Sequence, residues 1–303
     1  MLALSTAWNA SHSADGKTIA REIANLGINN IELNFSLTKK MVEEIFNFCE
    51  SNNLHVTSLH NFCPIPDGLN RQEALPDCFS LASLNEQERQ KAVEYTKISV
   101  QTAKRLKAKA VVLHCGRVEM EDKTRYLIDV LRKERVKTKA FEEIAHAFIQ
   151  ERQKKAPPHL EQLLKSLKDL CAYSQDHDCI LGLENRFYYR EIPVLTEFEV
   201  IFNRLKSKNI TYWHDVGHAF IFEKLGFLEK EALLKNFGSR LSGIHLHDIK
   251  NLNDHQAPLA GEFDFKTLVP YVTKNTIKVI EAHSCASVQD IQKSILYLGG
   301  LLP

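Results

Sequence analysis

Residues 210–226, ITYWHDVGHAFIFEKLG, begin like a buried strand and then change character. Mostly apolar and aromatic residues are followed by His214, Asp215 and, across Gly217, by His218. A strand that is covered on both faces has no structural need for imidazoles and a carboxylate at its end. The stretch therefore predicts a buried strand that hands over to a loop carrying functional side chains.

The same alternation of short apolar runs and longer amphipathic stretches continues along the chain. Eight runs have strand character: MLALSTAW (1–8), NNIELNF (29–35), HVTSLHNF (55–62), AKAVVLHCG (108–116), CILGLENRF (179–187), ITYWHDVGH (210–218), LSGIHLHDI (241–249) and TIKVIEAH (276–283). Amphipathic stretches predict helices at residues 17–26, 38–52, 86–106, 159–176, 196–206, 227–237 and 287–299. Apolar strands separated by helices indicate parallel strands with both faces covered. Eight such units predict an α/β fold, a single (β/α)8 TIM barrel over residues 1–303.

Two segments depart from a regular repeat. Residues 117–158, after the fourth strand, are charged and predict a helical insertion, a pair of helices that ends at Pro157 and Pro158. Residues 249–264 predict a long loop after the seventh strand. In a barrel both segments lie at the C-terminal face, where loops build the active site. The insertion is a candidate lid or dimer contact, so a homo-oligomer is one expectation.

Composition narrows the class of protein. The 303 residues carry 39 basic and 38 acidic side chains, a net charge of +1, so no overall field favours nucleic acid or an anionic membrane. The 7 cysteines include no CxxC pair, and no apolar run reaches the roughly 20 residues of a membrane helix. The N-terminus does not resemble a signal peptide. These features predict a cytoplasmic protein with reduced thiols and no membrane partner.

Polar residues gather at one end of the predicted strands. His60, His114, Glu184, Asp215, His245 and Glu281 stand at or near the ends of strands 3 to 8. Three carboxylates and one imidazole, from Glu184, Asp215, Glu281 and His245, make a site suited to Mn2+, Mg2+, Co2+ or Zn2+. Without a cation the converging carboxylates would repel one another. The sequence therefore predicts a divalent metal site, against the alternative of a structural ion-pair network.

Further candidates stand close to these four ligands. His218 follows Asp215 across Gly217, which would let the chain turn and bring His218 back over the site, where it would bind substrate or orient a metal ligand. His245 and His247 face the same side of one strand, so we expect one on the metal and the other, next to Asp248, held by the loop. His60, His114 and His255 are either ligands or ordinary histidines. His214 faces the opposite way from Asp215 and is not expected in the site.

Taken together, LGLENRF, WHDVGHA, IHLHDI, DHQAPLAGEFDF and VIEAH resemble the xylose isomerase-like TIM barrels. This superfamily includes sugar (phosphate) isomerases and epimerases, inosose dehydratases and endonuclease IV. Its ketose 3-epimerase pattern implies the ligand set Glu184, Asp215, His245 and Glu281. The two glutamates would double as the catalytic acid/base pair, and His218 would hold the substrate. Those epimerases usually carry an arginine where this chain has Asn251, and Arg186 could supply the guanidinium.

The endonuclease IV pattern implies a larger cluster. His60, His114, His218 and His255 match its additional ligands, which would complete a three-metal site. The aspartate that pattern places two residues before the last histidine is Asn253 here, although Asp254 lies adjacent. We therefore expect one or two metal ions.

Two classes of enzyme follow from these sites. The first is a metal-dependent isomerase or epimerase that converts a small carbohydrate or related polyol carbonyl compound through an enediolate. An inosose-dehydratase-like lyase is a close variant. The second is an endonuclease IV-like phosphodiesterase acting on abasic DNA, against which the balanced charge argues. A metal-binding barrel without catalytic activity is the third alternative.

Overall fold

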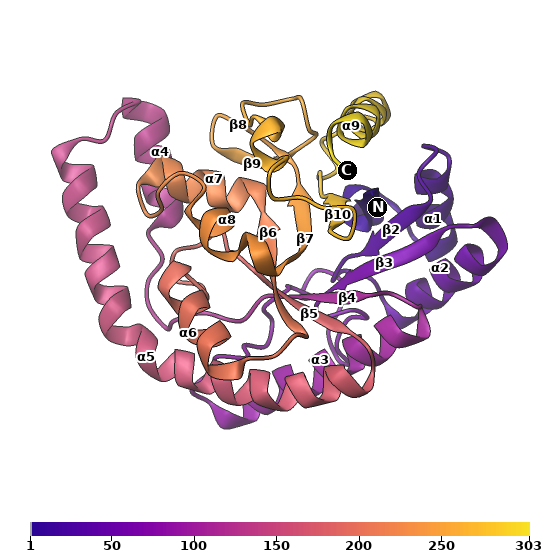
Figure 1. The fold of residues 1–303 in the computed structure, drawn as a ribbon, viewed down its shortest axis with the longest axis horizontal. Helices are drawn as coiled ribbons and strands as arrows, with labels where there is room; N and C mark the ends of the chain where they lie inside the picture. Colours follow the sequence, from indigo (N-terminus) through magenta and orange to yellow (C-terminus); the bar gives the residue numbers. More distant parts are fainter. Residues whose placement is uncertain (1) are drawn as a thin grey trace.

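The computed structural model describes residues 2–303 and confirms the predicted barrel. All neighbouring strands of the barrel pair in parallel, and the barrel closes in the order β1-β10-β7-β6-β5-β4-β3-β2 (Figure 1). The barrel strands are Leu2–Ser5 (β1), Asn30–Leu33 (β2), His55–His60 (β3), Ala110–Leu113 (β4), Ile180–Glu184 (β5), Ile210–Asp215 (β6), Leu241–Leu246 (β7) and Ile277–Ile280 (β10).

Helices form the outer layer (Figure 1). They are Gly16–Ala24 (α1), Lys39–Asn52 (α2), Glu86–Arg105 (α3), Thr124–Glu134 (α4), Lys139–Asp176 (α5), Leu195–Leu205 (α6), Val216–Leu225 (α7), Ala232–Phe237 (α8) and Val288–Leu301 (α9). Short polar side chains set several of their starts, because a side-chain oxygen accepts a backbone N–H that the first turn leaves unpaired. Asp15 does this for α1 and Asn85 for α3. Asp215 caps α7 by accepting the N–H of His218 at 2.7 Å.

The insertion after β4 differs from the expectation. Instead of a helical pair that ends at Pro157 and Pro158, α5 continues through both prolines as one element of 38 residues. A proline inside a helix removes a backbone hydrogen bond and bends the helix, and the α5 ribbon in Figure 1 turns from one side of the molecule to another. Lateral contacts hold the bend, since His159 Nδ1 lies 2.9 Å from the Ala82 carbonyl and Ser166 donates to the Leu81 carbonyl.

Three other boundaries also differ from the sequence expectations. The helix predicted at 227–237 is only the short α8, and the stretch 210–226 passes directly from β6 into α7 rather than into a loop. The segment 249–264 is not simply a loop. Together with Asp248 it forms an antiparallel hairpin of Asp248–Lys250 (β8) and Asn253–Gln256 (β9). The two added strands lie outside the barrel, on the loop after β7.

The floor of the barrel is filled by one large side chain. Trp213 of β6 is fully buried among Ala3, Ala110, Val112, Ile277 and Val279. It fits because β7 has a glycine beside it: a Cβ at Gly243 would lie 2.1 Å from Trp213 Cζ3. Apolar side chains thus fill the barrel interior below its C-terminal mouth.

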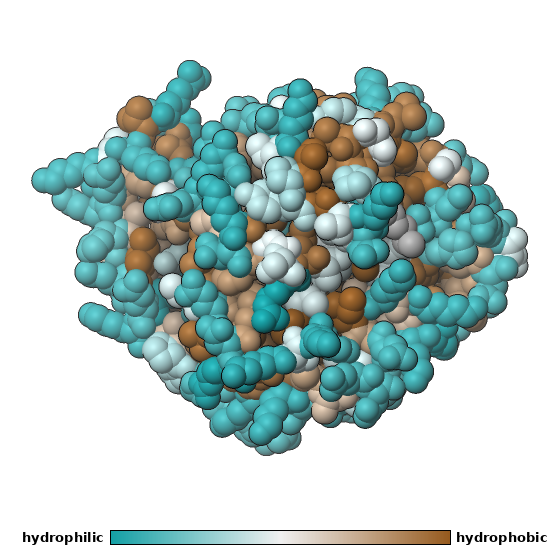
Figure 2. All heavy atoms as spheres, in the orientation of Figure 1, coloured by the Kyte–Doolittle hydropathy of each residue, from teal (hydrophilic) through white to brown (hydrophobic). Residues whose placement is uncertain are grey.

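The outer surface has a different character from the interior. Figure 2 shows hydrophilic side chains over most of the face in view, around smaller hydrophobic areas. Among the helices of residues 2–303, none is both long and apolar enough to cross a membrane.

Candidate metal centre

A cavity of about 410 Å³ opens at the C-terminal ends of the strands. Most of the residues that the sequence singled out lie on its walls: His60, His114, Glu184, Arg186, His218, His255 and Glu281. They come from segments far apart in the chain and meet because parallel strands of a barrel end at the same rim. The predicted convergence of these side chains is therefore present in the structure.

Glu184, Asp215, His245 and Glu281 form the centre of this group. One ligand atom from each lies within 4.8 Å of all the others, and all four residues are buried. His245 Nδ1 lies 2.8 Å from Glu184 Oε1 and 3.0 Å from Glu281 Oε2. Their closeness follows from strand pairing, because Asp215 of β6 stands opposite His245 of β7.

The electrostatics of this centre fit a divalent cation. Burial disfavours charge on His245, but the Glu281 and Glu32 carboxylates outweigh it and hold the His245 pKa well above its ordinary value. Burial would likewise raise the pKa of Glu281, yet His245 lowers it to about 2. In the ion-free protein a protonated imidazole thus stands between buried carboxylates. A divalent ion among the same oxygens would neutralise them and take the place of that proton.

Glu32 is a member of the site that the sequence reasoning missed. It is fully buried on β2, and its carboxylate oxygens lie 3.1 and 3.3 Å from His245 Nε2. Ser58 donates a 2.7 Å hydrogen bond to the same carboxylate. Glu32 is therefore placed to accept the Nε2–H of His245 and leave Nδ1 for a metal. The available signal was a glutamate inside the otherwise strand-like run NNIELNF.

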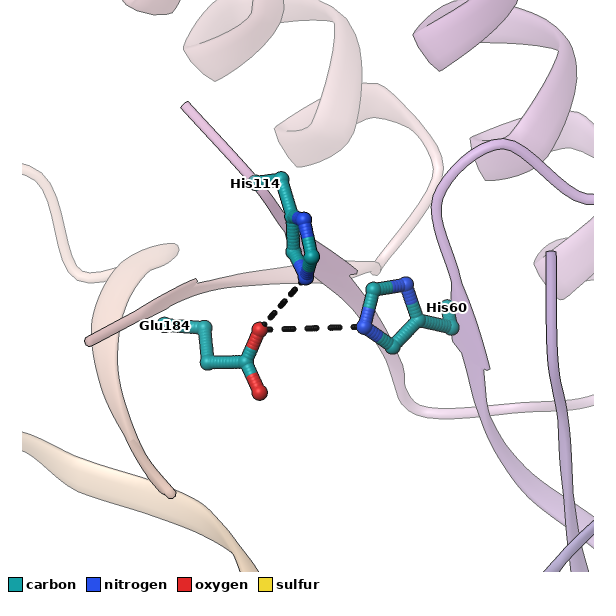
Figure 3. A group of neighbouring side chains, drawn as sticks. All are labelled: His60, His114 and Glu184. Atoms are coloured by element: carbon teal, nitrogen blue, oxygen red, sulfur yellow. Dashed lines mark ion pairs between the residues drawn. The ribbon is translucent and has the colours of Figure 1, made fainter. Parts of the chain in front are cut away.

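A second set of ligand types adjoins the first. In Figure 3, His60 of β3 and His114, just after β4, point at one carboxylate oxygen of Glu184. The distances to Glu184 Oε2 are 2.8 Å from His114 Nε2 and 3.7 Å from His60 Nε2. Burial and the nearby Arg186 guanidinium hold the His114 pKa well below its ordinary value, so this imidazole is neutral and able to coordinate.

A third set lies on the other side of Asp215. It consists of His218, Asp254 and His255. His218 Nδ1 lies 3.0 Å from the Asn185 carbonyl, to which it must donate, so its Nε2 keeps a lone pair on the side of Asp254. Asn253, which stands where the endonuclease IV pattern has its aspartate, is exposed and accepts from Arg132, whereas Asp254 lies beside both histidines. The acidic member of this set, Asp254, thus stands one residue further along the chain than the endonuclease IV pattern places its aspartate.

His247 is occupied by protein contacts at both ring nitrogens. Its Nδ1 accepts the backbone N–H of His255 at 2.9 Å, so Nε2 carries the proton and donates it to both Asp215 oxygens at 3.0 Å. This arrangement matches the expectation that one histidine of IHLHDI is held by the loop. Gly217 has a different role from the expected turn: it lies within α7, and a Cβ there would be 2.0 Å from His247 Cε1.

Two of the remaining candidates hold charges and loops in place. Arg186 donates to Glu184 Oε2 at 2.6 Å and lies 3.4 Å from Glu191 Oε1, so it compensates charge on the cavity wall. Asp248 does not line the cavity; its carboxylate accepts the N–H groups of Gly261 and Phe263 and fixes the loop after β7. The position occupied by an arginine in ketose 3-epimerases, Asn251, also lies outside the cavity.

His214 and the aromatic residues that follow β5 lie in different parts of the molecule. His214 faces away from the barrel interior, as expected, and its Nδ1 lies 2.5 Å from the Tyr212 hydroxyl. Phe187 and Tyr188 line the cavity. Arg125, from insertion helix α4, lies over both of these rings at 5.3 and 5.2 Å from their centroids. Tyr189 instead packs against Phe148 and Phe227 in the outer layer.

Solved structures with the same architecture are numerous, although their sequences are distant. A D-tagatose 3-epimerase-like protein superposes with a TM-score of 0.65 at 18% identity, covering 99% of this chain and 96% of its own. The 3-keto-D-glucoside 4-epimerase YcjR from E. coli gives 0.67 at 15%, covering 99% and 98%. The IolI protein with a bound zinc atom gives 0.68 at 12%, covering 99% of both chains.

A sequence comparison with curated proteins gave no match. The family model described as xylose isomerase-like TIM barrel, in contrast, matches residues 20–295. That match covers most of the chain, including all the residues of the candidate centre. The chain therefore belongs to the xylose isomerase-like TIM barrel family.

Proposed function

We propose that this protein is a divalent-metal-dependent isomerase or epimerase of a sugar, a sugar phosphate or a related polyol carbonyl compound. The observation that carries the proposal is the buried set of Glu184, Asp215, His245 and Glu281, of which Glu184 and Glu281 line the cavity. The similar solved structures support it, since several are named as epimerases of small sugars. A cavity of about 410 Å³ has room for one such molecule.

The four central residues would hold the ion. When bound, the ion would polarise a carbonyl and a neighbouring hydroxyl and so acidify the carbon-bound proton. Mn2+, Mg2+, Co2+ and Zn2+ all suit a set of three carboxylates and one imidazole.

Glu184 and Glu281 would move the proton. Burial opposes ionisation of Glu184, but Arg186 and His114 hold its pKa well below the ordinary value. His245 likewise lowers the pKa of Glu281 to about 2. Both are therefore carboxylates at neutral pH, and either can accept the carbon-bound proton on the way to an enediolate. Return of a proton to the neighbouring carbon would give isomerisation, and return to the same carbon from the opposite face would give epimerisation. Loss of a β-hydroxyl from that enediolate would give the inosose-dehydratase-like variant.

Isotope exchange tests this reaction. The Mn2+-loaded protein is incubated in D2O with a panel of ketoses, aldoses, inososes and their phosphates, and exchange of the carbon-bound proton is followed by NMR. We expect exchange with at least one compound, and its loss in Glu281→Gln. Glu94→Gln, which changes an exposed glutamate on α3, serves as the matched control. If none of the compounds exchanges its proton, the proposal has to be abandoned.

A second candidate, an endonuclease IV-like phosphodiesterase, is favoured by the two additional ligand sets. His60 and His114 share Glu184 with the central set, and His218, Asp254 and His255 stand next to it, so several ions could lie close together. Adjacent ions can activate water and hold the leaving oxygen of a phosphodiester. The net charge of +1 gives no general attraction to a duplex. Metal stoichiometry and nicking of an abasic duplex distinguish the two: one ion per chain with no nicking excludes the hydrolase.

A further inference from the structure

The β8–β9 hairpin carries two residues of the candidate centre on a strained backbone. Asn251, Leu252 and His255 have φ values of 51°, 58° and 53°, in the left-handed region that only glycine adopts freely. A non-glycine residue is disfavoured in this region, because its Cβ lies too close to the following carbonyl oxygen. A hairpin of this kind needs contacts from outside to keep Asp254 and His255 in one place.

Arg132 of insertion helix α4 supplies those contacts. Its Nε donates to the Asn251 carbonyl at 2.8 Å, and its Nη2 donates to the Leu252 carbonyl at 2.8 Å and to Asn253 Oδ1 at 2.6 Å. Asp129, one helical turn earlier, lies 3.1 Å from Nη1 and orients the guanidinium. Arg132 thus binds the carbonyl oxygens of both Asn251 and Leu252, the two left-handed residues of the turn.

The hairpin is in turn connected to the metal ligands. The His255 N–H bonds to His247 Nδ1, and this bond fixes the tautomer in which His247 Nε2 donates to Asp215. The rings of His247 and His255 also stack, with centroids 4.2 Å apart and planes 6° from parallel. A displacement of the hairpin would therefore move His255 directly and release Asp215 through His247.

We infer that Arg132 is a positioning residue: it holds the β8–β9 hairpin so that Asp215 and His255 are presented to a metal ion. The insertion is then part of the support of the metal centre. The inference rests on the metal centre of the proposed function, but not on the reaction catalysed there.

Cobalt spectroscopy tests the inference without a substrate. Co2+ is titrated into chelator-treated wild type, Arg132→Ala, Arg132→Lys and Arg135→Ala, and the visible absorption and metal content are recorded. Arg135 is the matched control, because it is exposed just after α4. It also lines, together with Arg132, a second cavity between the end of α4 and the β8–β9 turn. We expect Arg132→Ala to lose about tenfold or more in Co2+ affinity and to change the spectrum. Arg132→Lys should recover part of the loss, and Arg135→Ala should match wild type.

The outcomes separate this inference from the proposed function. If Arg132→Ala lowers only the thermal stability of the ion-free protein and binds Co2+ with the wild-type spectrum and affinity, Arg132 is merely structural and the inference is wrong, while the proposed function stands. If wild type binds no Co2+, both fail. Should Arg132→Ala not fold, Asn253→Ala removes one of the three contacts, and we expect a smaller change of the same kind. A wild-type spectrum and affinity in Asn253→Ala would then overturn the inference.

Discussion

The floor and the mouth of this barrel are built by the same strands, but apolar side chains line the floor and ionisable side chains line the mouth. On β6, Trp213 lies in a dry layer of apolar residues, and two positions later Asp215 lies among carboxylates and imidazoles. On β10, Val279 belongs to the floor, and two positions beyond it Glu281 belongs to the mouth. Because side chains of a strand alternate, a two-residue step keeps the direction and changes only the depth.

The difference shows how the two layers depend on each other. The rings of Trp213 and His245 lie 5.4 Å apart, so the floor ends directly beneath a proposed metal ligand. A packed apolar layer keeps water away from one side of the centre, and ionic interactions are stronger where water is excluded. The floor should therefore contribute to metal affinity as well as to stability.

The largest expected effect comes from emptying the floor. Trp213→Ala should lower the free energy of unfolding by about 3–5 kcal/mol, because the adjoining Gly243 has no side chain that could fill the cavity. Chemical denaturation measures this, with Tyr126→Ala, an exposed site, expected to change the value by less than about 0.5 kcal/mol. We also expect weaker metal binding, since His245 loses its support. If Trp213→Ala bound the metal ion with wild-type affinity, the floor would contribute to stability but not to metal binding.

The next largest effect should come from the mouth. Glu184→Gln removes the carboxylate shared by the central set and the His60–His114 set, and we expect metal affinity to fall by roughly 100-fold or more. Calorimetric titration of the ion-free protein measures the loss, and circular dichroism verifies the fold. Unchanged affinity would show that the metal ion binds at a site that does not include Glu184.

A smaller effect is expected behind His245. Glu32→Gln keeps the shape of the side chain but removes the charge that faces His245 Nε2, so metal affinity should fall by about 10- to 100-fold. Ser58→Ala removes only the hydroxyl that bonds to Glu32 and should have a weaker effect in the same direction. If the serine variant lost more affinity than the glutamate variant, the role given to Glu32 would be wrong.

The smallest effect should be the pH dependence of metal binding. Burial lowers the pKa of His255, but Asp254 outweighs it and raises that pKa to about 9. Below this pH the imidazole is protonated and must lose its proton to coordinate, so affinity should rise with pH, by at most about tenfold per pH unit for one proton. Titration in two buffers of different ionisation enthalpy measures the released protons. His245 is also protonated in the ion-free protein and would release one proton on coordination, so release of no more than one proton at neutral pH would exclude His255 as a ligand.

The sequence was most informative where its pattern is periodic. Alternation of strands and helices predicted the barrel, and histidines and acids after apolar strands predicted which side chains meet at its mouth. Glu32 was not predicted because a single glutamate in a short strand has no periodic signal. Only its contact with His245 identifies it as a member of the site. The continuous α5 escaped because the two prolines predict a break, whereas lateral bonds from His159 and Ser166 hold the bent helix.

The sequence also could not assign roles within the site. IHLHDI places His245 and His247 on the same face, but only the N–H of His255 decides which ring is held by the loop. That bond depends on the turn of the β8–β9 hairpin, with its left-handed residues, and non-glycine residues give no clear local sign of that conformation.

The absence of a side chain at residue 217 also has an evolutionary consequence. The His247 ring occupies the space that a methyl group there would fill, so the two positions cannot change independently. We expect homologous sequences with alanine in place of Gly217 to carry a smaller residue in place of His247. Covariation of this pair would then divide the family into members that orient the strand-6 aspartate with an imidazole and members that orient it by other means.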